Sequence, residues 1–304
     1  MTAPLIADVR HGQAPAKINL YLEVLGRRPD GFHELVTVLQ TIDLWDDLSV
    51  ALRDRRKHIA PGEPDITLEL IPQSPQGDSP AAVVPSGPDN LVVRAATALL
   101  AQCHAHGDCA VTLTLRKGIP AGGGLGGGSS DAALTLRLLN DLLGSPCDSA
   151  ALQHLAATLG SDVPFFLTGG TALCRGRGEV VEPISGPRPF ELLLHLPGFG
   201  LSTPTVFREL NAPLCSNSSD TQRQLDATAF DNASVAVLEE LYRNDLEDPA
   251  KSSEPRLAAL LNAQDLHLSG SGSTLFRYIP THTSLLVNTS ETQGQFVRTA
   301  SRTR

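Results

Sequence analysis

One segment near the middle of the chain constrains the fold more than any other. From Gly122 to Gly128, every residue except Leu125 is a glycine. A backbone without Cβ atoms can approach a ligand closely and point its amides at one centre. Before this segment, Ala110–Arg116 alternates apolar and Thr residues like a strand, and after it Asp131–Leu143 carries apolar residues at helical spacing. The order of strand, glycine loop and helix predicts a backbone cradle for phosphate.

Two hydroxyl side chains, Ser129 and Ser130, follow the glycines at the expected first turn of the helix. The N–H groups of a helix N-terminus have no partner inside the helix, and the helix dipole there favours an anion. A flexible connection between two elements is the alternative, but so many glycines cost conformational entropy without returning packing. The segment is therefore interpreted as a phosphate-binding loop.

The ligand that carries the phosphate is harder to identify from the loop alone. Gly122, Gly124 and Gly127 fit the G-x-G-x-x-G pattern of dinucleotide-binding proteins, with Asp148 about 20 residues further on. The preceding strand alternates, however, whereas a Rossmann strand is a continuous buried apolar run. The chain has neither a G-x-x-x-x-G-K-[ST] motif nor the VAIK, HRD and DFG motifs of protein kinases. A dinucleotide-dependent oxidoreductase remains the distant alternative.

Two other short blocks place charged residues among apolar ones. Lys17 and Asn19 lie two residues apart, on the same face of an expected apolar strand. Asp162 is expected in a loop between a helix end and an apolar strand, and Pro164 fixes the path of that loop. Taken alone, Lys17 could be a lysine at a strand edge whose amine reaches water, and Asp162 an ordinary turn residue.

The remaining pattern predicts an α+β fold. Expected strands are Ile18–Leu25, Leu35–Ile42, Asp47–Leu52, Ile66–Ile71, and later ones near Thr171, Leu192–Leu196 and Thr274–Tyr278. Expected helices are Asn90–Ala101, Ser145–Leu159 with a capping box formed by Ser145 and Asp148, and runs near Val206 and Val235–Leu241. The stretch Pro72–Pro88 is expected to be a loop, and Thr281–Arg304 is polar and weakly patterned.

Composition limits the compartment and the partners. With 304 residues and 41% hydrophobic side chains, the chain is long enough for two domains of roughly 100 to 200 residues each. A net charge of -9 gives no basic surface for nucleic acid. The chain has no apolar run of about 18 residues, and Met1–Gln13 has no long apolar stretch. We expect a cytoplasmic protein without nucleic-acid or membrane partners, as a monomer or a weak homodimer.

The cysteines favour a reducing compartment. They are odd in number and scattered, and none forms a C-x-x-C pair. Cys103, His104, His106 and Cys109 are close in sequence, but their spacing matches no standard metal site. We expect free thiols and no protein metal site.

Several of these blocks together resemble the GHMP superfamily of kinases. The phosphate loop of that superfamily begins with Pro-x-x-x-Gly-Leu-Gly, as at Pro120–Gly126, and ends in serines, as at Ser129 and Ser130. Leu268–Ser273 matches the third motif of the superfamily. Four stretches resemble, more narrowly, the kinases that act on a cytidine diphosphate derivative of methylerythritol; these are Pro15–Leu20, Arg28–Glu34, Gly122–Asp131 and Leu159–Pro164. The resemblance spans Ala14 to Phe276.

The resemblance implies a fold and a reaction. The fold would be α+β with two lobes, an ATP-binding lobe at 1–170 and a second lobe at 171–304, with the active site in the cleft between them. ATP with Mg²⁺ would phosphorylate the 2-hydroxyl of the small-molecule substrate, in the non-mevalonate route to isoprenoid precursors. Asp162 would accept the hydroxyl proton, and Lys17 would lie beside it and keep it ionised.

The resemblance also implies binding roles for individual residues. For ATP these are Pro120, Ala121, Gly122, Gly123, Gly124, Leu125, Gly126, Gly127, Gly128, Ser129 and Ser130 around the phosphates, with Asn90 and Lys117 in the adenine pocket. For the substrate, Phe32 and Phe207 would clamp the cytosine ring, His33 would bind its edge, and Asn19 would orient the erythritol part. Phe32 stands where a Tyr is common.

Three alternatives remain open within this resemblance. Phe32 and Phe207 could be core aromatics. The chain could be a different GHMP kinase, or a sensor that keeps the fold without activity. The presence of both Lys17 and Asp162 speaks against a sensor.

Overall fold

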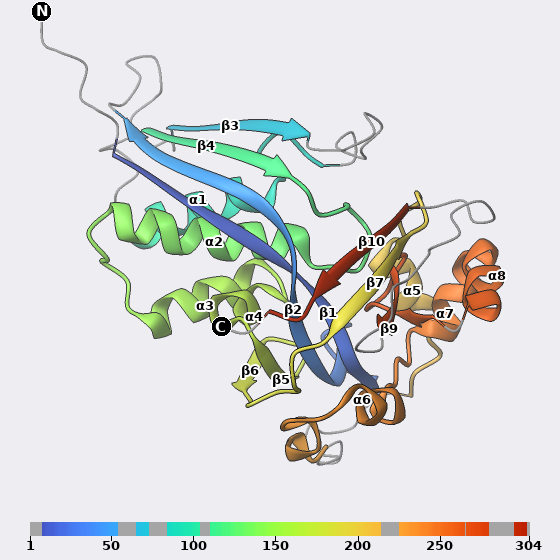
Figure 1. Cartoon of the computed structure of the whole chain (residues 1–304). Coiled ribbons are helices and arrows are strands. Elements are labelled where there is room, and N and C mark those ends of the chain that lie inside the picture. Colours follow the sequence, from blue (N-terminus) through green and yellow to red (C-terminus); the bar gives the residue numbers. More distant parts are fainter. Residues whose placement is uncertain are drawn as a thin grey trace, which may run out of the picture. The chain divides into compact units, whose positions relative to one another are not determined.

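The structure is a computed structural model that describes residues 8–53, 65–72, 84–103, 110–213, 225–264, 266–279 and 295–302 (Figure 1). The chain divides into two compact units that alternate along the sequence. Unit 1 comprises Met1–Pro15, Leu44–Ile119 and Gly127–Leu167, and unit 2 comprises Ala16–Asp43, Pro120–Gly126 and Thr168–Arg304. The predicted lobe boundary between residues 170 and 171 stays a prediction.

Two long strands supply sheet residues to both units. They are β1 (Val9–Arg27) and β2 (His33–Arg53), and they pair with each other. The sequence predicted a break within β2 between Ile42 and Asp47, and this was wrong. The intervening residues include neither Gly nor Pro, so nothing in the backbone stops the strand from continuing.

Unit 1 contains the strand that leads into the glycine loop. The predicted strand at Ala110–Arg116 is confirmed as β4 (Ala110–Lys117). It pairs antiparallel with residues 47–53 of β2 and parallel with β3 (Asp65–Pro72). β4 therefore has a partner on each side, which fixes the position at which its chain leaves the sheet.

The helices of unit 1 follow the predictions with two exceptions. α1 (Leu91–Gln102), α2 (Gly127–Leu142) and α3 (Ser149–Leu159) pack against one another (Figure 1). α3 begins four residues later than predicted, because the Asp148 side chain caps it by accepting from the amide of Ala151. The predicted capping box at Ser145 is wrong.

The second exception follows Asp162. The residues from Val163 were predicted to be an apolar strand, but they form the short helix α4 (Val163–Thr168). Pro164 is tolerated there because it lies in the first turn, where its missing N–H is not needed. A short apolar run has no periodicity that separates strand from helix, so the sequence alone could not decide between them.

Unit 2 contains a second sheet. Its strand order is β10 (Gln295–Ala300), β7 (Glu191–Leu196), β9 (Leu275–Ile279) and β8 (His267–Leu268), and neighbouring strands pair antiparallel. Next to β2, β5 (Thr171–Arg175) and β6 (Val180–Pro183) form an antiparallel pair. The weakly patterned C-terminal stretch thus includes a strand at 295–300.

The helices of unit 2 are short. They are α5 (Thr203–Glu209), α6 (Val235–Leu241), α7 (Glu247–Ser253) and α8 (Pro255–Gln264), with a 3₁₀ turn at Ala227–Phe230. Val206 of α5, Ala250 of α7 and Leu257 of α8 are buried in one apolar cluster. The partly buried Phe207 packs against it. This cluster supports the segments that surround the glycine loop within unit 2.

Candidate functional site

Within unit 2, the glycine loop lies against the stretch from Ser269 to Thr274. A Cβ atom on Gly124 would lie 2.1 Å from the carbonyl oxygen of Ser269, and a Cβ atom on Gly123 would lie 2.6 Å from the Thr274 Oγ1. Gly124 also has a φ of +74°, which side chains disfavour. The glycines are therefore required by close backbone contact as well as by conformation.

Protein donors bind successive carbonyl oxygens of this loop. The Gly122 oxygen accepts from the Leu201 amide at 3.1 Å, and the Gly123 oxygen accepts from the Thr274 amide at 3.0 Å. The Gly124 oxygen accepts from the Lys17 ammonium at 2.7 Å, and the Leu125 oxygen from the Lys17 amide at 2.9 Å. Carbonyls fixed in this way leave the N–H groups of the loop as the groups that can bind an anion.

Lys17 is a buried cation at the loop. Only 4% of it is exposed, so it is not a strand-edge lysine whose amine reaches water. Its ammonium donates to the Asn19 Oδ1 at 2.7 Å as well as to Gly124, and the Asn19 Nδ2 donates to the Thr37 hydroxyl at 2.9 Å. The structure thus brings together Lys17, Asn19 and the loop, and the contact of Lys17 with the loop was not predicted from the sequence.

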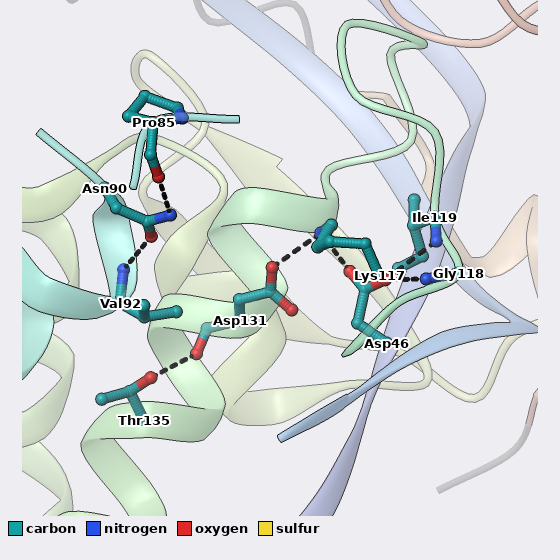
Figure 2. A network of polar contacts seen from close by, with 9 residues as sticks. All are labelled: Asp46, Pro85, Asn90, Val92, Lys117, Gly118, Ile119, Asp131 and Thr135. Atoms are coloured by element: carbon teal, nitrogen blue, oxygen red, sulfur yellow. Dashed lines mark hydrogen bonds and ion pairs between the residues drawn. The ribbon is translucent and has the colours of Figure 1, made fainter. Parts of the chain in front are cut away.

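In unit 1, Lys117 is the centre of a second buried polar network (Figure 2). Its ammonium donates to the carboxylate of Asp46 and to that of Asp131, the latter at 2.7 Å. Burial alone would lower the pKa of Lys117, but the charges of Asp131 and Asp46 outweigh this effect and raise it. Burial raises the pKa of the Asp131 carboxyl well above its usual range, although Lys117 opposes the shift.

Asn90 acts as the cap of α1 (Figure 2). Its Oδ1 accepts from the Val92 amide at 2.9 Å, and its Nδ2 donates to the carbonyl oxygen of Pro85 at 2.6 Å. Asn90 and Lys117, the two residues that the resemblance assigned to the adenine pocket, thus hydrogen-bond other protein groups through their side chains. That assignment stays a prediction.

The N-terminal part of α2 contains two buried oxygens that bind no protein donor within the described part of the chain. They are the Ser130 hydroxyl, in a residue that is 1% exposed, and the Asp131 Oδ1. A buried hydroxyl without a partner is costly unless a ligand satisfies it. Because Ser130 lies at a helix N-terminus directly after the glycines, an anion is the ligand that suits this position. Gly127, Gly128 and Ser129 precede it in the same turn, and Pro120 and Ala121 enter the loop.

Asp162 lies in unit 1, half-buried, directly before α4. Lys17 belongs to unit 2. The predicted pairing of Asp162 with Lys17 stays a prediction.

The predicted base-binding residues lie in unit 2. The His33 and Phe207 rings contact each other, with centroids 4.9 Å apart. Phe32 is 49% exposed and is therefore not a core residue, and the Arg177 guanidinium lies 5.0 Å from the centroid of its ring. Burial, and to a smaller extent the charge of Arg27, lowers the pKa of His33. This shift favours the neutral imidazole, which can hydrogen-bond a base edge.

Sequence reasoning missed Asp46 and Arg177 as contributors to these two sites. Asp46 lies between Ile42 and Asp47, where the sequence predicted a break between two strands. Its partner Lys117 is 71 residues away, so no local pattern joins the two residues. The contact of Thr274 with the glycine loop was signalled by the neighbouring Leu268–Ser273 motif, but the motif did not indicate which atoms of the loop would be bound.

Two further findings concern metals and membranes. The described part of the chain contains no group of three His, Cys, Asp or Glu side chains placed to hold a metal ion. Residues 104–109, which include His104, His106 and Cys109, lie outside the described residues. The cysteines at 103, 147 and 174 form no disulfide bond within the described part of the chain. No helix among the described segments has the length and apolar character needed to cross a bilayer.

Comparison with known proteins gives consistent results. The family described as GHMP kinases N terminal domain matches residues 90–170. The 4-diphosphocytidyl-2-C-methyl-D-erythritol kinase of Brevibacillus brevis is 37% identical over 273 residues, which covers 88% of this chain and 86% of that protein. The protein of the same name from Rhodococcus jostii is 40% identical over 258 residues, covering 83% of this chain and 76% of that one.

Solved structures agree with this result. A crystal structure of 4-(cytidine 5'-diphospho)-2C-methyl-D-erythritol kinase is 34% identical and has a TM-score of 0.62, covering 89% of this chain and 90% of that one. The L. major mevalonate kinase is 14% identical with a TM-score of 0.67, covering 100% of this chain and 99% of that one, and shows the fold alone. The predicted α+β fold is confirmed, and an oxidoreductase is excluded.

Proposed function

Because this chain belongs to the family of 4-diphosphocytidyl-2-C-methyl-D-erythritol kinases, within the GHMP kinases, we propose that it transfers the γ-phosphate of ATP to the 2-hydroxyl of that cytidine compound. The step belongs to the non-mevalonate route to isoprenoid precursors. One observation carries the assignment of the site: a glycine loop whose carbonyls are held by protein donors runs directly into a helix turn with a buried, unpartnered Ser130 hydroxyl.

The phosphates of ATP are assigned to this loop and turn. The N–H groups of residues 122–128 and the hydroxyls of Ser129 and Ser130 supply donors at a positive helix end. Asn90 and Lys117 are assigned to the wall of the adenine pocket. The methylene groups of their side chains would contact the base, because their polar ends already bind protein groups.

Magnesium suits this set of residues. Mg²⁺ in kinases is usually bound by phosphate oxygens, water and only one or two protein ligands, so a carboxylate cluster is not required. The Ser130 hydroxyl, which has no described protein partner, is assigned to the ion through a lone pair of its oxygen, while its hydrogen can still be donated to a phosphate. When bound, the ion neutralises charge that develops on the phosphates.

The chain's own residues supply the remaining chemistry. Asp162 accepts the proton of the attacking hydroxyl, and Lys17 stabilises the negative charge near the reacting groups. Lys17 is fixed for this role by its hydrogen bonds to Asn19 and Gly124. Phosphoryl transfer depends mainly on positioning and charge stabilisation, so one base, one cation and an amide cradle are sufficient.

The cytidine part is assigned to the aromatic residues of unit 2. Phe32 and Phe207 stack on the cytosine ring, and neutral His33 binds its edge. Asn19 orients the erythritol part, since its amide nitrogen carries a second hydrogen besides the one donated to Thr37. The scattered cysteines support a cytoplasmic protein, and the net charge of -9 supports one without a nucleic-acid partner. We propose a monomer or a weak homodimer.

The test is ADP release by the purified protein with ATP, Mg²⁺ and the cytidine compound, beside homoserine, mevalonate and galactose. We expect turnover with the cytidine compound alone and inhibition by CDP. Asp162→Asn keeps the shape but removes the base, so its kcat should fall by about 10²-fold or more. Turnover with mevalonate or homoserine instead would assign a different GHMP kinase, and near-normal turnover in Asp162→Asn would reject the assigned role of Asp162.

A further inference from the structure

Polar side chains in unit 1 join the two ends of the glycine loop. Lys117 ends the strand that enters the loop, and Asp131 lies in the helix that leaves it. Their side chains bind each other at 2.7 Å (Figure 2). We call Lys117–Ile119 and Gly127–Asp131 the two stems of the loop. The Lys117–Asp131 contact links these stems directly.

Asp46 fixes the entering stem from a third element, β2. One carboxylate oxygen accepts from the amides of Gly118 at 2.5 Å and Ile119 at 2.8 Å, and the other accepts from the Lys117 ammonium (Figure 2). Asp46 is 0% exposed. A single carboxylate therefore binds three successive residues directly before Pro120.

The two stems also pack closely. A Cβ atom on Gly127 would lie 3.0 Å from the Ile119 side chain and 3.3 Å from the Lys117 Nζ. A Cβ atom on Gly118 would lie 2.5 Å from the carbonyl oxygen of Trp45. The stem Lys117–Ile119 thus has little room to move while Asp46 binds it. The hydrogen bonds of Lys117 set the distance between this stem and the stem Gly127–Asp131.

We propose that Asp46 is a positioning residue for the nucleotide: it sets the spacing of the two stems, and through them the placement of the loop amides and of the Ser130 hydroxyl. Asp46 acts through Gly118, Ile119 and Lys117 and does not touch the reacting atoms. The inference rests on the proposed function, because it takes the anion at this loop to be the phosphates of ATP.

The test variant is Asp46→Asn, which keeps the size and one acceptor oxygen but removes the charge. Its matched control is Asp47→Asn, the same change at the next position of the same strand, where the side chain is half-buried and binds Gln13 at 3.4 Å. The readouts are the Kd for MgATP and for MgADP by calorimetry, without the second substrate, and the separate KM values for ATP and for the cytidine compound.

We expect Asp46→Asn to raise the Kd for MgATP and the KM for ATP by about tenfold or more, with the KM for the cytidine compound within about twofold of the wild-type value. Asp47→Asn should change neither. A role confined to stability would lower the melting temperature and the active fraction while the Kd stayed unchanged, and that result would overturn the proposal.

A second variant and a measurement on the wild-type chain make the experiment conclusive in the remaining cases. If Asp46→Asn does not fold, Asp46→Glu keeps the charge but displaces the carboxylate by one methylene, and the same rise in Kd is expected. If the wild-type chain binds MgATP but does not turn over the cytidine compound, the proposed function fails, while the Kd comparison still decides the role of Asp46. No binding of MgATP by the wild-type chain would overturn both.

Discussion

The glycine loop and its stems differ in the kind of contact that fixes each of them. In the loop, the Leu201 and Thr274 amides and the Lys17 ammonium bind backbone carbonyl oxygens. In the stems, a lysine is buried with two carboxyl groups. The hydrogen bonds of the loop fix backbone oxygens, whereas those of the stems join charged side chains to one another, so losing one partner in the stems leaves a buried charge unpaired.

The two lysines provide the strongest test of this difference. Lys17→Met should lower kcat by about 10²-fold to 10³-fold, because it removes a preorganised cation, and it should change the melting temperature less than the stem variant does. Lys117→Met should leave two buried carboxyl groups without their cation and lower the free energy of unfolding by about 3 to 5 kcal/mol. Steady-state kinetics and urea unfolding of both variants measure these effects. Equal kinetic and stability losses in both variants would remove the distinction between the two regions.

Gly124→Ala perturbs the loop alone. The added methyl group would meet the Ser269 carbonyl oxygen, and the φ of +74° disfavours any side chain, so the loop backbone must shift. Backbone strain of about 1 to 3 kcal/mol corresponds to a roughly 5-fold to 150-fold rise in the Kd for MgATP. Calorimetry measures it, and Gly144→Ala is the control because its φ is +81° but nothing lies within 4 Å of the added methyl group. A rise in Kd that is as large in Gly144→Ala would show that the contact with Ser269 is not the cause.

Local patterns were sufficient to predict much of the fold. The loop between β4 and α2, the helix that begins near Asn90 and the end of α3 before Gly160 each depend on neighbouring residues, and each was predicted. The break predicted within β2 and the strand predicted at Val163 depended on acidic residues and on a short apolar run. Neither signal fixes the backbone conformation, so packing decided both.

The candidate site was predictable to the extent that its residues form compact motifs. A lysine on an apolar strand face needs partners if it points inward, and Lys17 is buried with Asn19 as one of its partners. The partners of Lys117 were not predictable, because Asp46 comes from a strand 71 residues earlier and pairs through the sheet register. Side chains that support a loop from a distance leave no motif in the sequence, although they fix its geometry.

The smallest expected effect tests the charge balance of the stems. Burial raises the pKa of Asp131 from 3.8 to about 8, so the folded state holds this proton over a pH range in which the unfolded chain has lost it. The contribution of Asp131 to stability is therefore greatest at low pH and falls as the pH rises through that window. Asp131→Asn has no such proton, so its unfolding free energy should improve relative to wild type between about pH 5 and pH 8. Urea unfolding at three pH values measures the difference, with Asp141→Asn on the exposed side of α2 as the control. A constant difference between Asp131→Asn and wild type across this range would show that Asp131 is ionised throughout, and that the stems contain a full ion triad.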